Sequence, residues 1–371
     1  MIFSNVFDPV PVAVGGVRQR VMQAELKYVS DADPGIRRLR RGKGHCYVLP
    51  DGKLLKDEKV RSRIKALGIP PAYQDVWICL DENGHIQATG TDSRGRKQYR
   101  YHSAWEEARN RHKFAQLASF GASLPRIRRR IRKDMEAEMP DETAILAAML
   151  ALIDETHIRV GNKAYAKENR TYGAATLLKR HVCLGDESSV RFRFPAKGGR
   201  PDEHVVESQF LHDVLEEIAD LDGRELFSWR DEDGEKHALD SGRLNRYLGE
   251  ISRGDFTAKT FRTWAGSLAA FRHALGAVGQ GRQPSKKGMC EAAARDLHNT
   301  PAICRTSYVH PAVLDLAEDT APLAPVSGPP KRRSGLKADE SRFLAFLEIS
   351  ETNAIDSGRP KARKSSKPAR I

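Results

Sequence analysis

The spacing of hydrophobic and polar positions changes character near residue 104 of this chain. Before that point, short apolar segments are separated by turn-forming residues, a pattern typical of β-strands. Hairpin turns are predicted at Asp51-Gly52 and Asn83-Gly84. The predicted strands cover residues 44–49, 76–80 and 85–90, and one short helix covers residues 60–67. These elements indicate a small β-rich domain.

After residue 104 the apolar positions follow the period of amphipathic helices. A single β-hairpin interrupts them, with strands over 190–194 and 204–208 and a Pro-Ala-Lys-Gly-Gly-Arg-Pro tip. The predicted helices cover residues 104–120, 124–137, 141–160, 206–220, 241–251, 258–275, 286–297 and 301–307. The expected fold class is therefore α+β, with a small β-rich N-terminal domain and a larger, mainly helical domain.

Four regions follow from these patterns. Residues 1–24 mix Pro, Gly and Val with little periodicity and are expected to form a flexible N-terminal lead-in. Residues 25–104 are the β-rich domain, and residues 105–320 are the mainly α domain. Residues 321–371 are Pro-rich and then basic, so we expect a basic, largely disordered tail.

Charge narrows the range of partners. The 62 Lys and Arg against 49 Asp and Glu leave a net charge of +13, which favours polyanions and predicts salt-sensitive nucleic-acid binding. A solvated basic surface accounts for the charge equally well. Residues 331–371 hold 11 Lys and Arg against 5 Asp and Glu, so the tail is either a solubilising segment or a non-specific DNA arm.

Missing motifs exclude several classes of site. The five cysteines are scattered without a C-x-x-C pair, so the sequence predicts neither a zinc site nor a disulfide framework, and a reducing, cytoplasmic location follows. No apolar run approaches the length of a membrane span. Without a phosphate-binding G-x-x-x-x-G-K-[ST] loop or an H-E-x-x-H motif, neither ATP, a metal nor another cofactor is expected.

Four segments together supply what attack on a phosphodiester requires. The negative transition state can be stabilised by fixed Arg donors without a metal, and the leaving oxygen needs a proton donor such as Lys. A tyrosine hydroxyl becomes an effective nucleophile when cations surround its target. The segments are 155–165 with Arg159, 192–200 with Lys197, 259–264 with Arg262, and 297–308 with Asn299 and Tyr308.

In these segments the chain resembles the type IB DNA topoisomerases, specifically the short poxvirus-like form found in bacteria. The resemblance runs from about Leu26 to Leu316. It implies a catalytic domain with the tyrosine-recombinase and topoisomerase IB fold, closing with the β-rich DNA-binding domain as a clamp around duplex DNA.

The resemblance also assigns roles to five side chains. Tyr308 is the expected nucleophile, Arg159 and Arg262 the phosphate-binding arginines, and Lys197 the general acid. Asn299 stands where poxvirus and nuclear relatives place a His, nine residues before the tyrosine. Its amide can donate a hydrogen bond but cannot act as a base. The neighbouring His298 is out of register and receives no role.

Five further side chains are expected to contact DNA. The segment 88–102 interleaves basic residues with Gln and Tyr, which suits phosphate anchoring and major-groove contacts, although its composition also fits a basic edge strand and loop. The resemblance adds a phosphate contact after Arg159 and a lysine one turn before Arg262. The expected DNA-contacting residues are Gln98, Tyr99, Tyr101, Tyr165 and Lys259.

The sequence therefore predicts a monomeric, nucleoid-associated type IB topoisomerase that relaxes supercoiled double-stranded DNA. The expected course is single-strand cleavage through a 3′-phosphotyrosyl intermediate, strand rotation and religation. A tyrosine site-specific recombinase is one alternative, although such enzymes usually have His-x-x-Arg where Lys259 and Arg262 stand. A non-catalytic basic DNA-binding protein is another, and it explains the charge but not the ordered motifs.

Overall fold

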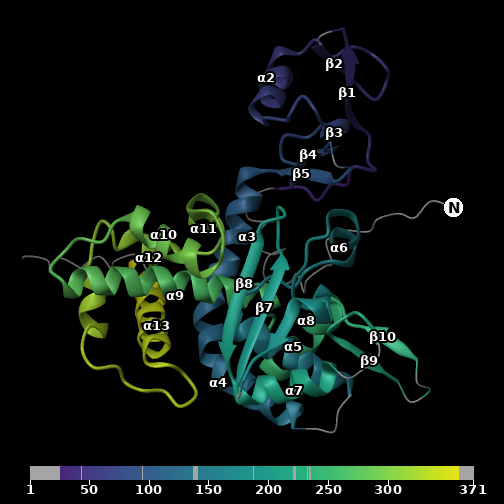
Figure 1. Ribbon diagram of the computed structural model, residues 1–371. Coiled ribbons are helices and arrows are strands. Elements are labelled where there is room, and N and C mark those ends of the chain that lie inside the picture. Colours follow the sequence, from purple (N-terminus) through teal and green to yellow (C-terminus); the bar gives the residue numbers. More distant parts are fainter. Residues whose placement is uncertain are drawn as a thin grey trace, which may run out of the picture. The chain divides into compact units, whose positions relative to one another are not determined.

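The chain forms two compact units, Met1–Lys113 and Phe114–Ile371. The computed structural model describes residues 26–358 except 43, 94, 137–140, 187, 220–222, 232 and 234. The division falls within helix α3, Ser103–Ala115, and so lies nine residues after the predicted boundary at 104 (Figure 1). The predicted lead-in, residues 1–24, lies outside the described residues.

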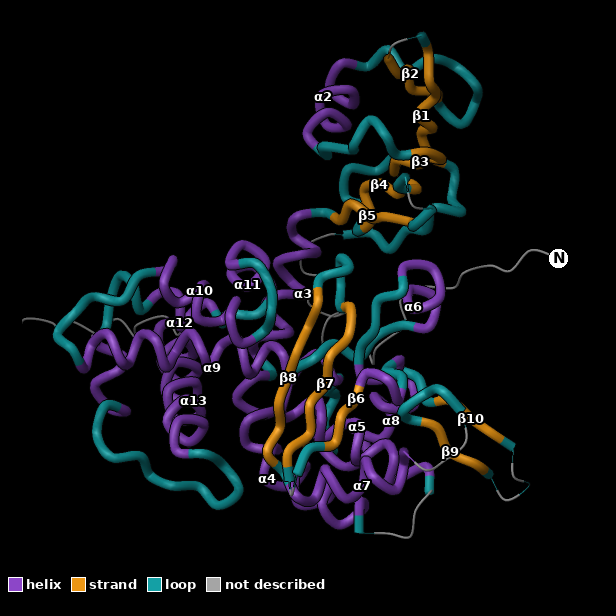
Figure 2. Tube along the Cα trace, in the orientation of Figure 1, coloured by secondary structure: helices purple, strands orange, loops and turns teal. Residues whose placement is uncertain are grey.

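The N-terminal unit is built on an antiparallel sheet with strand order β2-β1-β3-β4-β5 (Figure 2). Its strands are β1 Gly35–Arg41, β2 Gly44–Val48, β3 Gln74–Cys79, β4 Ile86–Thr91 and β5 Lys97–Tyr101. Helix α2, Glu58–Ala66, begins where the Asp57 carboxylate accepts hydrogen bonds from two backbone N–H groups of the first turn. Ile64 of this helix packs with Ile36, Val76 and Ile78 of the sheet. The predicted β-rich domain is confirmed.

Strand β1 was absent from the predicted elements. Its sequence, Gly-Ile-Arg-Arg-Leu-Arg-Arg, has two apolar side chains, of which Ile36 is buried and Leu39 is 50% exposed. The strand is formed because β2 and β3 pair with it on both edges. Pairing with strands distant in the chain thus forms a strand whose many arginines show no alternation of apolar and polar residues.

The C-terminal unit is mainly helical, as predicted, and contains two small sheets. Its helices are α4 Leu117–Met135, α5 Glu142–Thr156, α6 Lys163–Asn169, α7 Gln209–Ala219, α8 Ser241–Ser252, α9 Ala258–Gly279, α10 Lys286–Asp296, α11 Pro301–Ser307, α12 Pro311–Asp315 and α13 Ala338–Gly358, with short 3₁₀ helices at Ala174–Thr176, Lys179–His181 and Ala321–Val326. Its strands are β6 Val182–Leu184, β7 Ser189–Pro195, β8 Pro201–Glu207, β9 Ser228–Arg230 and β10 Lys236–Ala238. The sheet order β6-β7-β8 leaves β8 at an edge.

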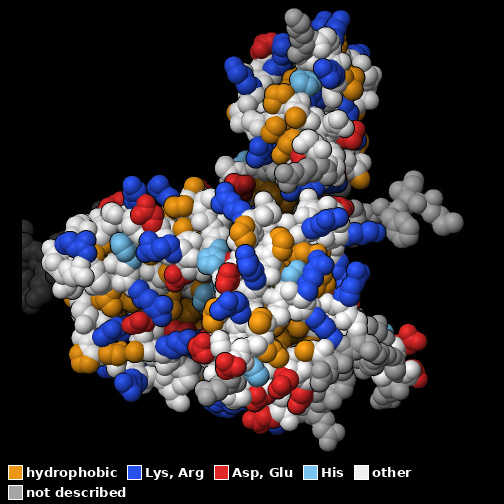
Figure 3. Space-filling view, viewed as in Figure 1, with side chains coloured by type: hydrophobic (Ala, Val, Ile, Leu, Met, Phe, Trp, Pro, Cys, Tyr) orange, Lys and Arg blue, Asp and Glu red, His pale blue; other side chains and the backbone are white. Residues whose placement is uncertain are grey.

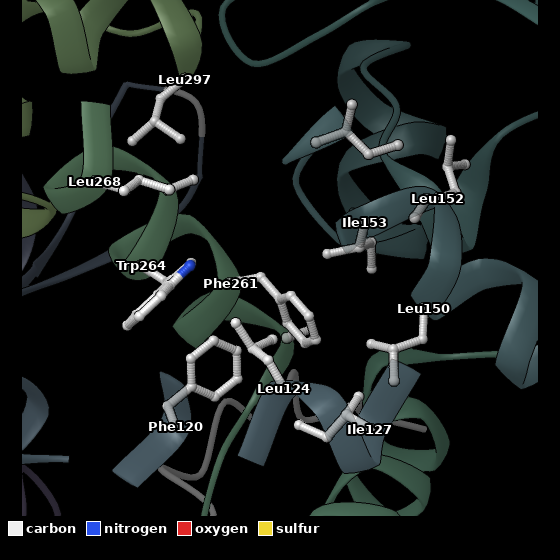
Figure 4. Packing of buried hydrophobic residues seen from close by; sticks show 14 of the residues in the cluster. Phe120, Leu124, Ile127, Leu150, Leu152, Ile153, Phe261, Trp264, Leu268 and Leu297 are labelled. Atoms are coloured by element: carbon white, nitrogen blue, oxygen red, sulfur yellow. The ribbon is translucent and has the colours of Figure 1, made fainter. Parts of the chain in front are cut away.

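Helices α4, α5 and α9 meet in the centre of this unit (Figure 4). The rings of Phe120 and Phe261 pack edge to face with centroids 4.9 Å apart. A Cβ on Gly121 would lie 2.4 Å from the Trp264 ring, so only glycine lets α4 and α9 approach so closely. This packing holds the start of α9 beside α5, and these two helices lead to Arg262 and Arg159.

The predicted disordered tail is wrong for residues 321–358. Leu323 and Val326 are buried in the 3₁₀ helix, and α13 adds four buried side chains to the core: Phe343, Leu344, Phe346 and Leu347. Arg128 of α4 pairs with Glu340 at 2.8 Å and with Asp154 of α5 at 2.7 Å.

Basic residues of this segment also have acidic partners, since Arg333 pairs with Glu348 at 2.6 Å and Lys337 with Glu155 at 3.6 Å. Apolar burial and ion pairing therefore order a segment whose Pro-rich and basic composition predicted disorder. Residues 359–371 lie outside the described part of the chain.

Candidate functional site

Tyr308 lies at the end of the short helix α11. The helix begins at Thr300, whose hydroxyl accepts a hydrogen bond from the Ile303 N–H at 3.4 Å, and Pro301 occupies its first position. The Ser267 hydroxyl of α9 donates to the Tyr308 carbonyl and accepts from the His310 N–H, both at 2.9 Å. Helix α9 therefore holds the backbone on both sides of Tyr308.

Arg262 of α9 connects three segments around this tyrosine. Its side chain is buried, and the guanidinium carbon lies 5.3 Å from the centroid of the Tyr308 ring. It donates one hydrogen bond to the His157 carbonyl and another, at 2.9 Å, to the Leu297 carbonyl. These carbonyls lie two residues before Arg159 and Asn299, so one guanidinium orders the backbone near both.

The charges around Tyr308 favour its phenolate. Burial is the largest influence on the Tyr308 pKa and raises it, but the charge and hydrogen bond of Arg262, with charges on Lys259 and Arg159, outweigh burial and lower the pKa below 10. Burial and the nearby Arg159 also lower the pKa of Arg262. Two arginines and a lysine thus act electrostatically on one phenol.

Arg262 also retains an unused donor. Among the described residues, its Nε is buried without a hydrogen-bond partner. Buried polar groups are usually hydrogen-bonded, and a group that binds during function is one explanation for a donor without a partner. A cationic donor beside a tyrosine fits an anion such as a phosphate.

Arg159 follows the end of α5. The helix ends at His157 in the left-handed conformation, with φ 55°. The Arg159 carbonyl accepts a hydrogen bond from the Ala174 N–H at 2.8 Å. A Cβ on Gly173 would lie 2.3 Å from that carbonyl, so the close approach requires glycine. These contacts fix the backbone that presents Arg159.

Lys197 lies at the tip of the β7–β8 hairpin. Strand pairing continues to Pro195 and Pro201, and the tip is closed by a 2.8 Å hydrogen bond from the Ala196 N–H to the Arg200 carbonyl. Gly198 and Gly199 have φ values of 85° and 74°, which favour glycine. The Lys197 side chain is exposed, and no contact within the described part of the chain joins it to Tyr308.

Asn299 lies in the turn between α10 and α11. Its backbone N–H donates to the Ala294 carbonyl, and its side-chain oxygen accepts from the Thr300 N–H, both at 3.0 Å. This arrangement uses the acceptor end of the amide and leaves the NH₂ end to donate. The role of Asn299 as a neutral hydrogen-bond donor stays a prediction.

The predicted DNA-contacting residues of the N-terminal unit lie on both faces of strand β5. On β5, Tyr99 and Tyr101 stack with centroids 5.9 Å apart and pack against Trp77 and Ile86. Gln98 lies on the opposite face, as neighbouring strand residues must, and donates to Asp92 at 3.1 Å. Gln98 and the tyrosine pair therefore lie on opposite faces of β5.

The other two expected contacts belong to the C-terminal unit. Lys259 is exposed on the first turn of α9, one turn before Arg262. Tyr165 lies in α6, but its side chain is outside the described part of the structure. In Figure 3, basic side chains gather around α6 and the tip end of the β7–β8 hairpin, whereas acidic ones gather near α7.

Sequence reasoning missed the residues that support the site. Gly266 contacts the Tyr308 segment so closely that an added Cβ would lie 3.0 Å from the Tyr308 Cβ. Its presence within a helical pattern was the available signal, because an isolated helical glycine often marks close packing. Ser267 and the His157 carbonyl gave no such signal, since their partners are 41 and 105 residues away.

Comparison with known proteins gives matches over most of the chain. Residues 102–300 match the family model described as eukaryotic DNA topoisomerase I, catalytic core, and residues 44–92 match bacterial DNA topoisomerase IB, N-terminal domain. DNA topoisomerase 1B of Acanthamoeba polyphaga mimivirus is 32% identical over 297 residues, which cover 77% of this chain and 88% of the viral protein.

More distant similarities cover about half of the chain. DNA topoisomerase 1B of Vaccinia virus (strain Copenhagen) is 28% identical over 156 residues, covering 42% of this chain and 49% of the viral protein. A solved structure of the XerH site-specific recombinase bound to difH substrate has 16% identity and a TM-score of 0.35, and the match covers 54% of this chain and 52% of that one. No helix among the described residues is both long and apolar enough to span a bilayer.

Proposed function

Since the chain belongs to the type IB DNA topoisomerase family, we propose that it relaxes supercoiled DNA through a 3′-phosphotyrosyl intermediate formed by Tyr308. The observation that carries this proposal is the contact between Arg262 and Tyr308. The guanidinium lowers the pKa of the phenol and has a buried Nε without a described partner. Both observations support a role for Arg262 in activating the nucleophile and in binding the phosphate.

In this mechanism Tyr308 releases its proton to solvent and its phenolate oxygen attacks the scissile phosphorus, from which the 5′-oxygen leaves. Arg159 and Arg262 bind the non-bridging oxygens and stabilise the added negative charge. The Asn299 amide donates a further, uncharged hydrogen bond. Lys197, carried on an exposed hairpin tip, protonates the leaving 5′-oxygen.

Religation reverses these steps. The 5′-hydroxyl attacks the phosphotyrosyl phosphorus, its proton returns to Lys197, and Tyr308 leaves. One phosphodiester is exchanged for another, so no nucleotide is needed to supply energy. Torsional strain in the DNA drives strand rotation between the two steps.

The proposed substrate is duplex DNA, and the proposed working unit is a monomer. The two units would act together on the duplex as a clamp, with the N-terminal unit contributing Gln98, Tyr99 and Tyr101 and the C-terminal unit Lys259 and Tyr165. Binding should weaken with rising salt, because phosphate contacts by Lys and Arg release counterions.

A plasmid relaxation assay tests the proposal. Wild-type protein, in EDTA and without ATP, should relax both positive and negative supercoils, whereas Tyr308→Phe should relax neither. On trapping with denaturant, DNA carrying a 5′-end label should stay attached to the protein, and DNA carrying a 3′-end label should not. Attachment of the 3′-labelled fragment, or exchange that requires two paired sites, would contradict the proposed mechanism.

A further inference from the structure

A buried carboxylate lies on the hairpin that carries Lys197. Asp202 occupies an inward position of β8, opposite Phe194 of β7, and its side chain is only 7% exposed. A buried charge is costly unless it is paired and hydrogen-bonded. Its position is one pair before the end of the strand ladder, directly below the tip. The contacts that keep this carboxylate ionised therefore bear on the placement of the tip.

Two histidines supply those contacts. His298 Nδ1 hydrogen-bonds to Asp202 Oδ1, and His204 Nε2 lies 3.1 Å from the same oxygen, within ion-pair distance but without hydrogen-bond geometry. The rings of His204 and His298 stack with centroids 4.7 Å apart. His298 directly precedes Asn299, so this cluster joins the edge of β8 to the turn between α10 and α11. Asp202 also contributes to the electrostatic surroundings of Arg262.

We propose that Asp202 is a positioning residue, which holds the Lys197 hairpin against the Asn299 turn through His298 and His204. This inference rests on the proposed function of Lys197 as general acid. The tip contains two glycines with positive φ, which are conformationally permissive, and a hydrogen bond one residue pair before the end of the strand ladder limits the positions that the tip can take. The same hydrogen bond fixes the position of the Lys197 hairpin relative to the Asn299 turn.

The direct Asp202–His298 hydrogen bond accounts for the geometry of this cluster. The three ligand-type atoms also lie within 4.8 Å of one another, a spacing that a metal ion could bridge. These readings differ in their response to a chelator, because a hydrogen bond is insensitive to EDTA.

Full-length variants with a modified substrate test the inference. The cleavage site is first mapped on an end-labelled duplex, and the duplex is then made with a bridging sulfur in place of the 5′-oxygen at that bond. A thiolate leaves without protonation, so this substrate bypasses the general acid. The variants are Asp202→Ala and His298→Asn, and Asn suits the left-handed φ of 46° at residue 298. Glu203→Ala is the matched control, because Glu203 lies on the outward face of the same strand.

Both variants should slow cleavage of the ordinary duplex by about 10- to 100-fold and of the sulfur-containing duplex by less than about threefold. Glu203→Ala should match wild type on both substrates. The double variant should be no slower than the slower single variant, since both break one link. Thermal unfolding of each variant shows whether slower cleavage comes from a loss of fold or from a loss of positioning. His298 is half-exposed, so it can be replaced without opening the core.

Equal slowing on both substrates, or wild-type rates in both variants, would overturn the inference. Wild-type enzyme whose rate in EDTA falls to that of Asp202→Ala would also overturn it, in favour of a metal site. Absence of any covalent adduct with wild-type protein would instead refute the proposed function.

Discussion

Adding one methyl group at Gly266 should slow DNA cleavage much more than it destabilises the fold. A Cβ there would lie 2.8 Å from Leu297 Cδ1, 3.0 Å from Tyr308 Cβ and 3.1 Å from the Tyr308 carbonyl oxygen. Carbon atoms pack best at about 3.5–4.0 Å, so the Tyr308 backbone must move by roughly half an ångström. The Leu297 methyl group can rotate away, but the backbone of Tyr308 is held by Ser267.

The two effects of Gly266→Ala on stability partly cancel. Overpacking costs about 1–3 kcal/mol, and Ala gains about 1 kcal/mol over Gly in a helix, so the free energy of unfolding should fall by about 0–2 kcal/mol. Displacement of a reacting group has a steeper effect, and cleavage should slow by about 10- to 100-fold.

Gly276→Ala is the control, because it makes the same change in the same helix at a position where an added Cβ meets nothing within 4 Å. It should stabilise the protein by about 0.5–1 kcal/mol and leave cleavage unchanged. The assay is single-turnover formation of the covalent adduct, with urea unfolding measured in parallel. Wild-type cleavage by Gly266→Ala, or equal slowing in both variants, would refute the reasoning.

Three further outcomes are expected. The phenolate difference spectrum between wild type and Tyr308→Phe should titrate below pH 10, because nearby cations lower the pKa of Tyr308. The free energy of unfolding of wild type relative to Tyr308→Phe should rise with pH between that lowered pKa and 10. A spectral transition at or above pH 10 would contradict the effect of the arginines. Burial lowers the pKa of His157 from 6.5 to about 4. As the pH falls from 6.5 towards 4, the free energy of unfolding should therefore fall by up to about 3 kcal/mol. Urea titrations of His157→Asn should show a weaker dependence of stability on pH across that range. A chain ending at residue 337 should fail to fold by circular dichroism, because four buried side chains of α13 contribute about 1.5–3 kcal/mol each. A melting transition like that of the full chain would contradict the core role of α13.

Elements with strong local signals could be predicted closely. Helix α11 has the predicted bounds, Pro301–Ser307, because Thr-Pro marks its start. The turn at Asn83-Gly84 connects β3 and β4 as expected. In the candidate site, Arg262 and Tyr308 were both named from sequence, and the structure brings them into contact.

What the sequence did not reveal depends on partners distant in the chain. Helix α13 lies in the segment that was predicted to be disordered, since its burial requires Trp264 and Phe271, whose rings lie 4.9 and 5.3 Å from Phe343. The Asp202–His298 bond joins residues 96 positions apart, and no local pattern marks either residue. Periodicity reports a local conformation, whereas these contacts are decided by tertiary packing.

The Arg128 ion pairs give the protein two separate responses to ionic strength. Exposed cations that bind a duplex are screened within about 10 Å at 0.1 M salt. Arg128, Asp154 and Glu340 are largely shielded from solvent ions, with side-chain exposures of 22%, 9% and 5%. An increase in ionic strength that dissociates the enzyme from DNA should therefore leave helices α4, α5 and α13 packed together. The protein can then dissociate and rebind repeatedly without unfolding.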